Sequence, residues 1–185
     1  MKKRSLVLFV VLIAFSFLSA KAQDKIGIRA GYQVANWYDT DGADMGDNLN
    51  TFYLGLFKEN KLIPALHFGI GLEYFQNGYK GINTDDKQVL HILSVPVYAK
   101  VKLGPVFALG GLAGNFKVSE KVFVNGNSAS PTDAQKSKTV DVPLYLGAGV
   151  KIMMFTLEAR YHWGLVEVNH GLHNRYLQLG AAVSF

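Results

Sequence analysis

Apolar and polar positions alternate with a period of two along most of the chain after residue 25. In residues 26–34, Ile28 and Tyr32 fall on one face, while Arg29 and Gln33 fall on the other. This alternation predicts β-strands with one apolar face and one face of polar or small side chains. An eighth, glycine-rich segment at 106–118 is less regular, and the seven clear ones are 26–34, 51–56, 66–74, 89–102, 141–151, 153–163 and 176–185.

The lengths of these segments and of their connections predict how the strands are arranged. Most segments reach nine residues or more, whereas a globular strand averages about five or six and a tilted strand crosses a bilayer in about nine to eleven. Short connections at 58–64, 102–105 and 151–152 alternate with longer, more polar ones at 36–50, 77–87, 118–139 and 164–174. The chain is therefore predicted to form an all-β, eight-stranded, antiparallel up-and-down transmembrane β-barrel with four longer extracellular loops.

Five charged residues fall on the face opposite the apolar one and are predicted to point into the barrel: Arg29, Glu73, Lys100, Glu158 and Arg160. Because an unpaired buried charge is costly, we expect them to pair with one another and with tyrosine and glutamine. Glu158 and Arg160 should each have an opposite-charge partner. The opposite register would turn Arg160 toward lipid, which costs about 2–4 kcal/mol at the bilayer midplane. The apolar face is therefore predicted to meet lipid.

A soluble, lipocalin-like binding barrel is the structural alternative, and it would place the apolar face inward. The other face combines glycine, tyrosine, proline and charges of both signs rather than the apolar lining of a ligand cavity. This composition favours the membrane barrel. Side chains nearly fill the interior of an eight-stranded barrel, so the chain is predicted to be too narrow for a general diffusion porin.

The first twenty-two residues have the features of a cleaved export signal. A basic Lys-Lys-Arg start at 2–4 precedes an apolar run at 6–18, and Ala-Lys-Ala at 20–22 fits the small-x-small cleavage pattern. We therefore predict a signal peptide at 1–22 and a barrel domain at 23–185. The formal net charge of +5 belongs mostly to this segment, which contains four of the 19 basic residues. The rest of the chain has 15 basic and 14 acidic residues and is nearly neutral. A nucleic-acid partner is not expected.

A lipid-modifying enzyme, of the lipid A deacylase or acyltransferase type, is the alternative from another functional class. It needs a nucleophile and a base near the outer-leaflet interface. His91 is predicted on the lipid side near the outer rim, but no serine shares its strand face. His162 is predicted to point inward, while His170 and His173 form a loop His-x-x-His pair that could bind a metal weakly. No catalytic residue and no cofactor are expected, and the absence of cysteine from the sequence excludes a thiolate zinc site.

The first long connection is acidic. Four carboxylates lie between Asp39 and Asp47 without a basic residue, a composition that can bind calcium. The segment departs from the EF-hand pattern, however, because Ala43 stands at the fifth position and Asn50 at the twelfth. A solvated acidic loop is the simpler interpretation, and no metal site is predicted.

The chain resembles the outer-membrane β-barrel domain family of Bacteroidetes, the PorT-like or porin-family proteins, and more distantly the OmpA and OmpX type of eight-stranded barrel. The resemblance covers the whole chain after the signal segment. Three segments carry it: LSVPVYAK at 93–100, LEARYHWGL at 157–165 and LQLGAAVSF at 177–185. These segments are informative about the fold and say little about activity, because the family is functionally mixed.

The resemblance implies an outer-membrane location and a non-enzymatic role that is structural, surface-binding or secretion-accessory. In that family a C-terminal phenylalanine is the assembly signal read by the barrel-insertion machinery, and Phe185 matches it; an interfacial aromatic residue is the alternative reading. The expected partners are outer-membrane lipids, the assembly machinery during insertion, and an unidentified surface ligand or envelope protein. The barrel is expected to be a monomer.

Overall fold

The computed structural model describes residues 24–39, 41–44, 46–81, 86–124, 127–129, 137–169 and 171–185. The predicted signal peptide at 1–22 lies outside these residues, and so does His170 of the His-x-x-His pair. Within the described residues, no helix is long and apolar enough to cross a membrane.

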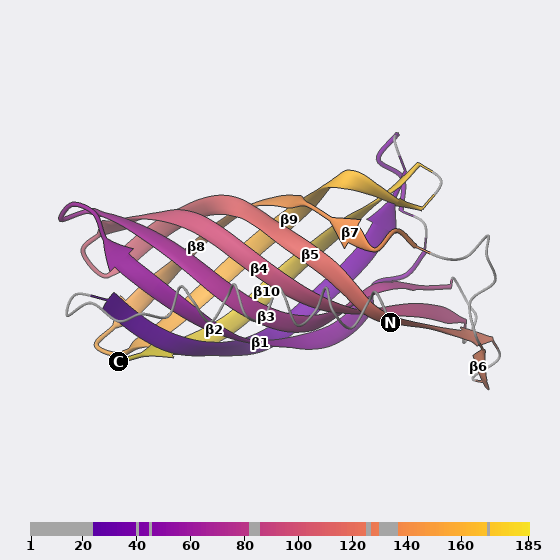
Figure 1. Ribbon diagram of the computed structural model, residues 1–185, viewed down its shortest axis with the longest axis horizontal. Helices are drawn as coiled ribbons and strands as arrows, with labels where there is room; N and C mark the ends of the chain where they lie inside the picture. The colour runs from indigo at the N-terminus through magenta and orange to yellow at the C-terminus, as the bar shows by residue number, and fades with distance from the viewer. Residues whose placement is uncertain are drawn as a thin grey trace, which may run out of the picture.

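Eight long antiparallel strands form a closed ring (Figure 1), which confirms the predicted fold. Each strand pairs with the next one around the ring, and β10 pairs with β1 to close it. Two short strands, β6 (Asn127–Ala129) and β7 (Val140–Asp141), pair with β5 beside the ring. The ring strands are β1 (Asp24–Tyr38), β2 (Leu49–Lys61), β3 (Leu66–Lys80), β4 (Lys87–Leu103), β5 (Val106–Val124), β8 (Pro143–Ile152), β9 (Phe155–Asn169) and β10 (Leu172–Ser184).

The two ends of the barrel differ. The turns at 62–65, 104–105 and 153–154 lie at one end with the start of β1 and the end of β10, on the left of Figure 1. We call this the short-turn end and the opposite one the long-loop end. The prediction of a loop at 164–174 was wrong for most of that range, because β9 and β10 continue as a paired hairpin in which His173 faces Glu167. The pairing of β9 with β10 continues beyond the residues in which apolar and polar side chains alternate, because backbone hydrogen bonds between strands do not require an apolar face.

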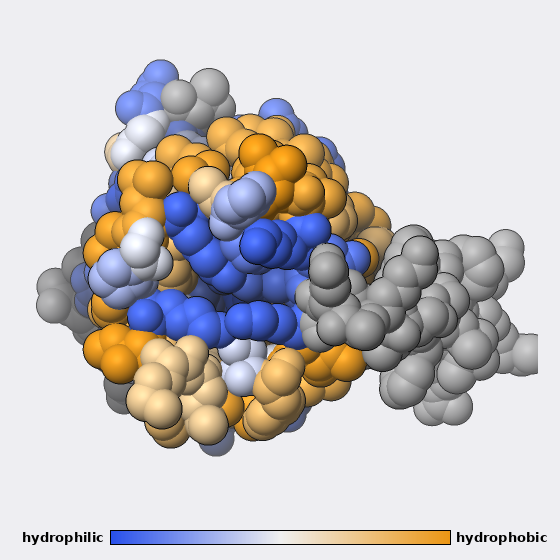
Figure 2. All heavy atoms as spheres, turned by 90° about the vertical axis from the view of Figure 1, so that its left-hand side faces the viewer, coloured by the Kyte–Doolittle hydropathy of each residue, from blue (hydrophilic) through white to orange (hydrophobic). Residues whose placement is uncertain are grey.

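The apolar side chains face outward, as the alternation predicts. Leu54 and Leu56 on β2 and Leu146 on β8 are about half exposed, whereas Arg29 and Gln33 on β1 are buried. This arrangement is the opposite of what the soluble lipocalin-like alternative requires. Figure 2, which views the short-turn end, shows hydrophilic residues in the middle and hydrophobic residues around them. The outer wall therefore suits lipid contact, and polar groups fill the interior at the short-turn end.

Two apolar clusters lie inside the ring in addition to the charged groups. One is centred on Trp37, Phe75 and Tyr176 from β1, β3 and β10. The other combines Tyr98 of β4 with Tyr145 of β8 and three residues of β5. Side chains from all parts of the ring thus fill the interior, as expected for eight strands.

Candidate functional site

A compact cluster of four charges occupies the barrel interior, and its side chains are 0–2% exposed. Arg160 binds Glu73 through two hydrogen bonds, with Nη1 to Oε1 at 2.7 Å and Nη2 to Oε2 at 3.2 Å. Arg29 Nη1 lies 3.3 Å from Glu158 Oε1 and 3.5 Å from Glu73 Oε1. Arg160 Nε lies 3.4 Å from the same Glu158 oxygen. Two guanidinium groups and two carboxylates therefore balance, and Glu158 and Arg160 each have opposite-charge neighbours.

Lys100 does not join this cluster directly. Its ammonium pairs with Glu59 on β2, a residue that the sequence analysis had assigned to a turn and did not consider. Lys102 Nζ lies 3.4 Å from the other oxygen of Glu59. The Tyr98 hydroxyl joins the two groups, since it accepts a hydrogen bond from Arg29 at 3.0 Å and donates one to Glu59 at 3.1 Å. The polar interior is therefore one connected network.

A glycine creates the space for this connection. Gly69 on β3 is the register partner of Tyr98 on β4, and a Cβ added at Gly69 would lie only 2.1 Å from the Tyr98 ring carbon Cζ. The tyrosine ring thus packs flat over the glycine backbone. This packing explains why glycine and tyrosine share the inward face of the predicted strands.

Above this network, on the side of the long-loop end, aromatic rings cross the interior. His162 is stacked between Tyr145 and Tyr176, with ring centroids 4.6 and 4.2 Å apart. Phe75 packs against Tyr176 in a tilted arrangement, with ring centroids 5.1 Å apart. All four side chains are buried. With the charged network, they fill the cross-section of the barrel, which leaves the protein's ends and outer wall for contact with other molecules.

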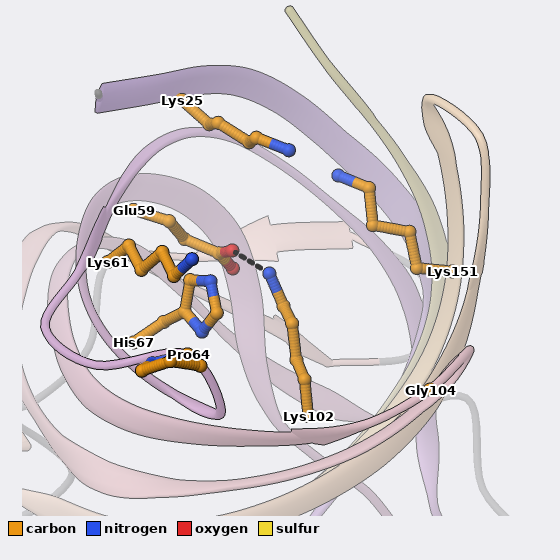
Figure 3. A pocket seen from close by; sticks show the side chains of 8 residues that line it. All are labelled: Lys25, Glu59, Lys61, Pro64, His67, Lys102, Gly104 and Lys151. Carbon is orange, nitrogen blue, oxygen red and sulfur yellow. Dashed lines mark hydrogen bonds and ion pairs between the residues drawn. The ribbon is translucent and has the colours of Figure 1, made fainter. Parts of the chain in front are cut away.

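The short-turn end opens into a cavity of about 570 Å³ on the barrel axis (Figure 3). It is lined by four lysines and one glutamate, and Figure 3 shows the lysine side chains reaching into the mouth. Lys151 Nζ also contacts the Ser184 hydroxyl. This site could not be recognised in the sequence, because its residues come from four separate stretches of the chain, at 25, 59–67, 102–104 and 151. The lining residues are Lys25, Glu59, Lys61, Pro64, His67, Lys102, Gly104 and Lys151.

The structure separates most of the residues considered for catalysis. Ser94 and His162 point into the filled interior and are buried. His91 lies on the outer face, where its Nδ1 is 2.6 Å from the Tyr74 hydroxyl. No serine shares the strand of His91 on that face, as expected, but Ser119, predicted in the connection at 118–139, lies in β5 and is the register partner of His91. This contact between strands could not be read from either strand alone.

The acidic first connection is partly bound to its own chain. Asp39 Oδ1 accepts a hydrogen bond from the Ala43 amide at 2.8 Å, and Asp44 pairs with Arg175 of β10. Among the described residues, no group of three or more histidine or acidic side chains is arranged to hold a metal ion. His173, from the His-x-x-His pair, stacks on Tyr38 with ring centroids 5.6 Å apart.

Phe185 lies at the short-turn end with its side chain 74% exposed. Its backbone N–H donates a hydrogen bond of 2.8 Å to the carbonyl of Ile26 on β1. The backbone is thus fixed at the seam of the ring while the aromatic side chain stays accessible. Its role as an assembly signal stays a prediction.

Comparison with known proteins agrees with this architecture. The chain is similar to Ail, the attachment invasion locus protein of Yersinia pestis, whose structure is known in complex with the heparin analogue sucrose octasulfate. The identity is 18% and the TM-score is 0.52, and the match covers 88% of this chain and 99% of that one. It is also similar to Neisserial surface protein A, at 18% identity and a TM-score of 0.57, covering 86% of this chain and 97% of that one. These likenesses concern the fold. No curated protein matches the sequence. The model of the outer membrane protein beta-barrel domain matches residues 6–185, and the chain belongs to this family of outer-membrane barrels.

Proposed function

We propose that the protein is a closed, non-enzymatic outer-membrane barrel of the Bacteroidetes PorT-like type, with a structural, surface-binding or secretion-accessory role. The filled interior is the observation that supports this proposal. The Arg29–Glu73–Glu158–Arg160 cluster and the ring stack around His162 occupy the space that a solute would need. The functional surfaces are then the two ends of the barrel.

Export by a cleaved signal peptide at 1–22 is part of the same proposal, as is insertion guided by Phe185. Outer-membrane barrels have short periplasmic turns and longer extracellular loops. The short-turn end, with Phe185, then faces the periplasm. The long-loop end carries the paired extension of β5 and β6 and the β9–β10 hairpin beyond the membrane (Figure 1). These are the surfaces offered to a ligand or envelope partner by a monomeric barrel.

Conductance measurements test whether the interior is closed. The protein, folded in detergent and checked by heat-modifiable gel migration, is added to a planar lipid bilayer at a fixed voltage. The expected result is a baseline without stable steps. A Tyr145→Ala variant serves as a comparison, because it removes one ring of the stack and leaves every charged residue in place. Stable discrete openings from the wild-type protein would overturn the proposal.

A lipid-modifying enzyme is the second candidate, and one observation favours it. Three residues on neighbouring strands meet on the outer face, on the half of the barrel nearer the long-loop end: Ser119, His91 and Tyr74. The Tyr74 hydroxyl is hydrogen-bonded to the His91 ring. A serine and an imidazole close together on the outer face are the residue types that acyl transfer requires. Mass spectrometry of lipid A after gene deletion, overexpression and Ser119→Ala substitution tests this function. Identical lipid A masses in all strains would eliminate it.

A further inference from the structure

The cavity at the short-turn end has an excess of positive charge. Its four lysines are opposed by one carboxylate, Glu59. Both oxygens of that carboxylate are already engaged, one by Lys100 from deeper in the barrel and the other by Lys102. Glu59 therefore cannot also neutralise Lys25, Lys61 and Lys151.

The lysines converge on the barrel axis for a structural reason. Lys25 and Lys61 have the same inward parity as Arg29 and Glu59 on β1 and β2, and Lys151 continues the inward row of β8 that contains Tyr145. Each charge therefore points toward the centre of the mouth rather than toward lipid. Low-dielectric walls around a mouth of one charge sign focus its field and raise the local concentration of counter-ions.

A histidine also lines this cavity. His67 is only 9% exposed, and its Nδ1 is fully buried and so not accessible to a ligand in the cavity. The positive charge of the site therefore comes from the lysines.

From these features we propose that the mouth is a binding site for a phosphate-bearing anion with at least two negative charges. A lysine ammonium is a compact charge with three donors that suits phosphate oxygens, and four such groups line the cavity. Several lysines around one axis require more than one negative charge for balance. The volume of about 570 Å³ lies within the usual range for small-ligand sites, about 300–1,000 Å³. This site is independent of whatever the long-loop end binds.

Calorimetric titration with pyrophosphate tests the site, using the full barrel in phosphatidylcholine nanodiscs. Lys25→Gln combined with Lys61→Gln is the test variant, because neither lysine has an acidic partner among the described residues. The matched control is Lys80→Gln with Lys121→Gln, which removes the same charge from exposed positions toward the other end. Loss of two charge-assisted hydrogen bonds should weaken pyrophosphate binding about tenfold or more in the test variant and leave the control close to wild type.

The same titration in nanodiscs containing cardiolipin, whose headgroup carries two phosphates, distinguishes two sources of the phosphate. Unchanged pyrophosphate affinity would indicate a soluble ligand. Weaker pyrophosphate binding in the presence of the anionic lipid, seen in the wild-type protein but not in the Lys25→Gln, Lys61→Gln variant, would indicate a lipid headgroup. Either result supports the site. Absence of heat from wild-type protein at millimolar pyrophosphate would overturn the proposal. Equal weakening in the test and control variants would also overturn it, because the effect would then come from overall charge.

Discussion

Arg160 on β9 binds Glu73 on β3 through two hydrogen bonds, although 87 residues separate them along the chain. Three strands, β2, β1 and β10, lie between β3 and β9 around the ring. The ion pair therefore crosses the interior and ties distant walls of the barrel together. It also gives hydrogen-bond partners to both Nη atoms of a guanidinium group that is completely buried.

Replacing Glu73 by alanine should strongly destabilise the barrel. The substitution leaves Arg29 and Arg160 with Glu158 as their remaining close carboxylate, and breaking a buried pair costs about 3–5 kcal/mol. Urea unfolding in detergent, followed by tryptophan fluorescence, measures the effect. Glu167→Ala is the control, because its ion pair with Lys138 is half exposed and such pairs contribute about 0–1 kcal/mol. Similar losses in the two variants would contradict the role assigned to the interior cluster.

The destabilisation caused by an arginine on the outer wall should depend on how deep in the membrane the substituted residue lies. Leu146 lies within β8 on the lipid-facing side, whereas Ile152 lies on the same side at the end of that strand. Leu146→Arg is expected to cost about 2–4 kcal/mol and Ile152→Arg about 0–1 kcal/mol. Unfolding of the two variants in lipid vesicles gives the comparison. Equal costs would mean that β8 does not cross the membrane as proposed.

Gly69→Ala should disturb the network through Tyr98. The new methyl group would overlap the tyrosine ring, whose hydroxyl joins Arg29 to Glu59. Overpacking of this kind costs about 1–3 kcal/mol. Gly114→Ala is a matched control, since a Cβ at that position makes ordinary contacts of 3.5 Å or more. The two stabilities are compared by urea unfolding, and an equally stable Gly69→Ala variant would show that Tyr98 is not held where the structure places it.

The attachment of Ser137 to β5 should depend on pH. Glu120 lies near the long-loop end of this 19-residue strand, outside the proposed membrane-spanning part. Burial alone would raise its pKa, but hydrogen bonds from Lys117, Gln88 and Ser137 outweigh burial and hold the pKa of Glu120 below the usual value of 4.5. A lowered pKa in the folded state means that the carboxylate stabilises this contact above about pH 4.5 and that the stabilisation is lost as the pH falls through the folded-state value.

Hydrogen exchange at the Ser137 amide, which donates to Glu120 at 3.2 Å, measures that attachment. Protection should decrease in acid in the wild-type protein beyond the intrinsic change in exchange rate. Glu120→Gln should show weaker protection at neutral pH and little further pH dependence. Identical pH profiles for the two proteins would rule out the carboxylate as the controlling group.

The alternation of side chains was sufficient to predict the ring and its inward charges, because each strand must separate lipid from the interior along its whole length. It was not sufficient to predict partners. Glu59 was missed because the polar run at 58–64 looks like a turn, and only pairing with β3 extends β2 as far as Lys61. Ser119 and His91 meet through the register of β4 and β5, which depends on contacts between strands. The cavity at the short-turn end has the same origin, since its lysines share no local motif.

The closing pair of strands has a consequence for the order of assembly. β1 and β10 lie at opposite ends of the described sequence, yet Gly27 pairs with Ser184 and Arg29 with Ala182. Until this seam forms, Arg29 cannot pair with Glu158 inside a closed barrel. The charged side chains of a partly assembled sheet would stay exposed on its open face. Full pairing of the four-charge cluster thus requires closure of the ring, so a chain interrupted before β10 gains little of the electrostatic stability of that cluster.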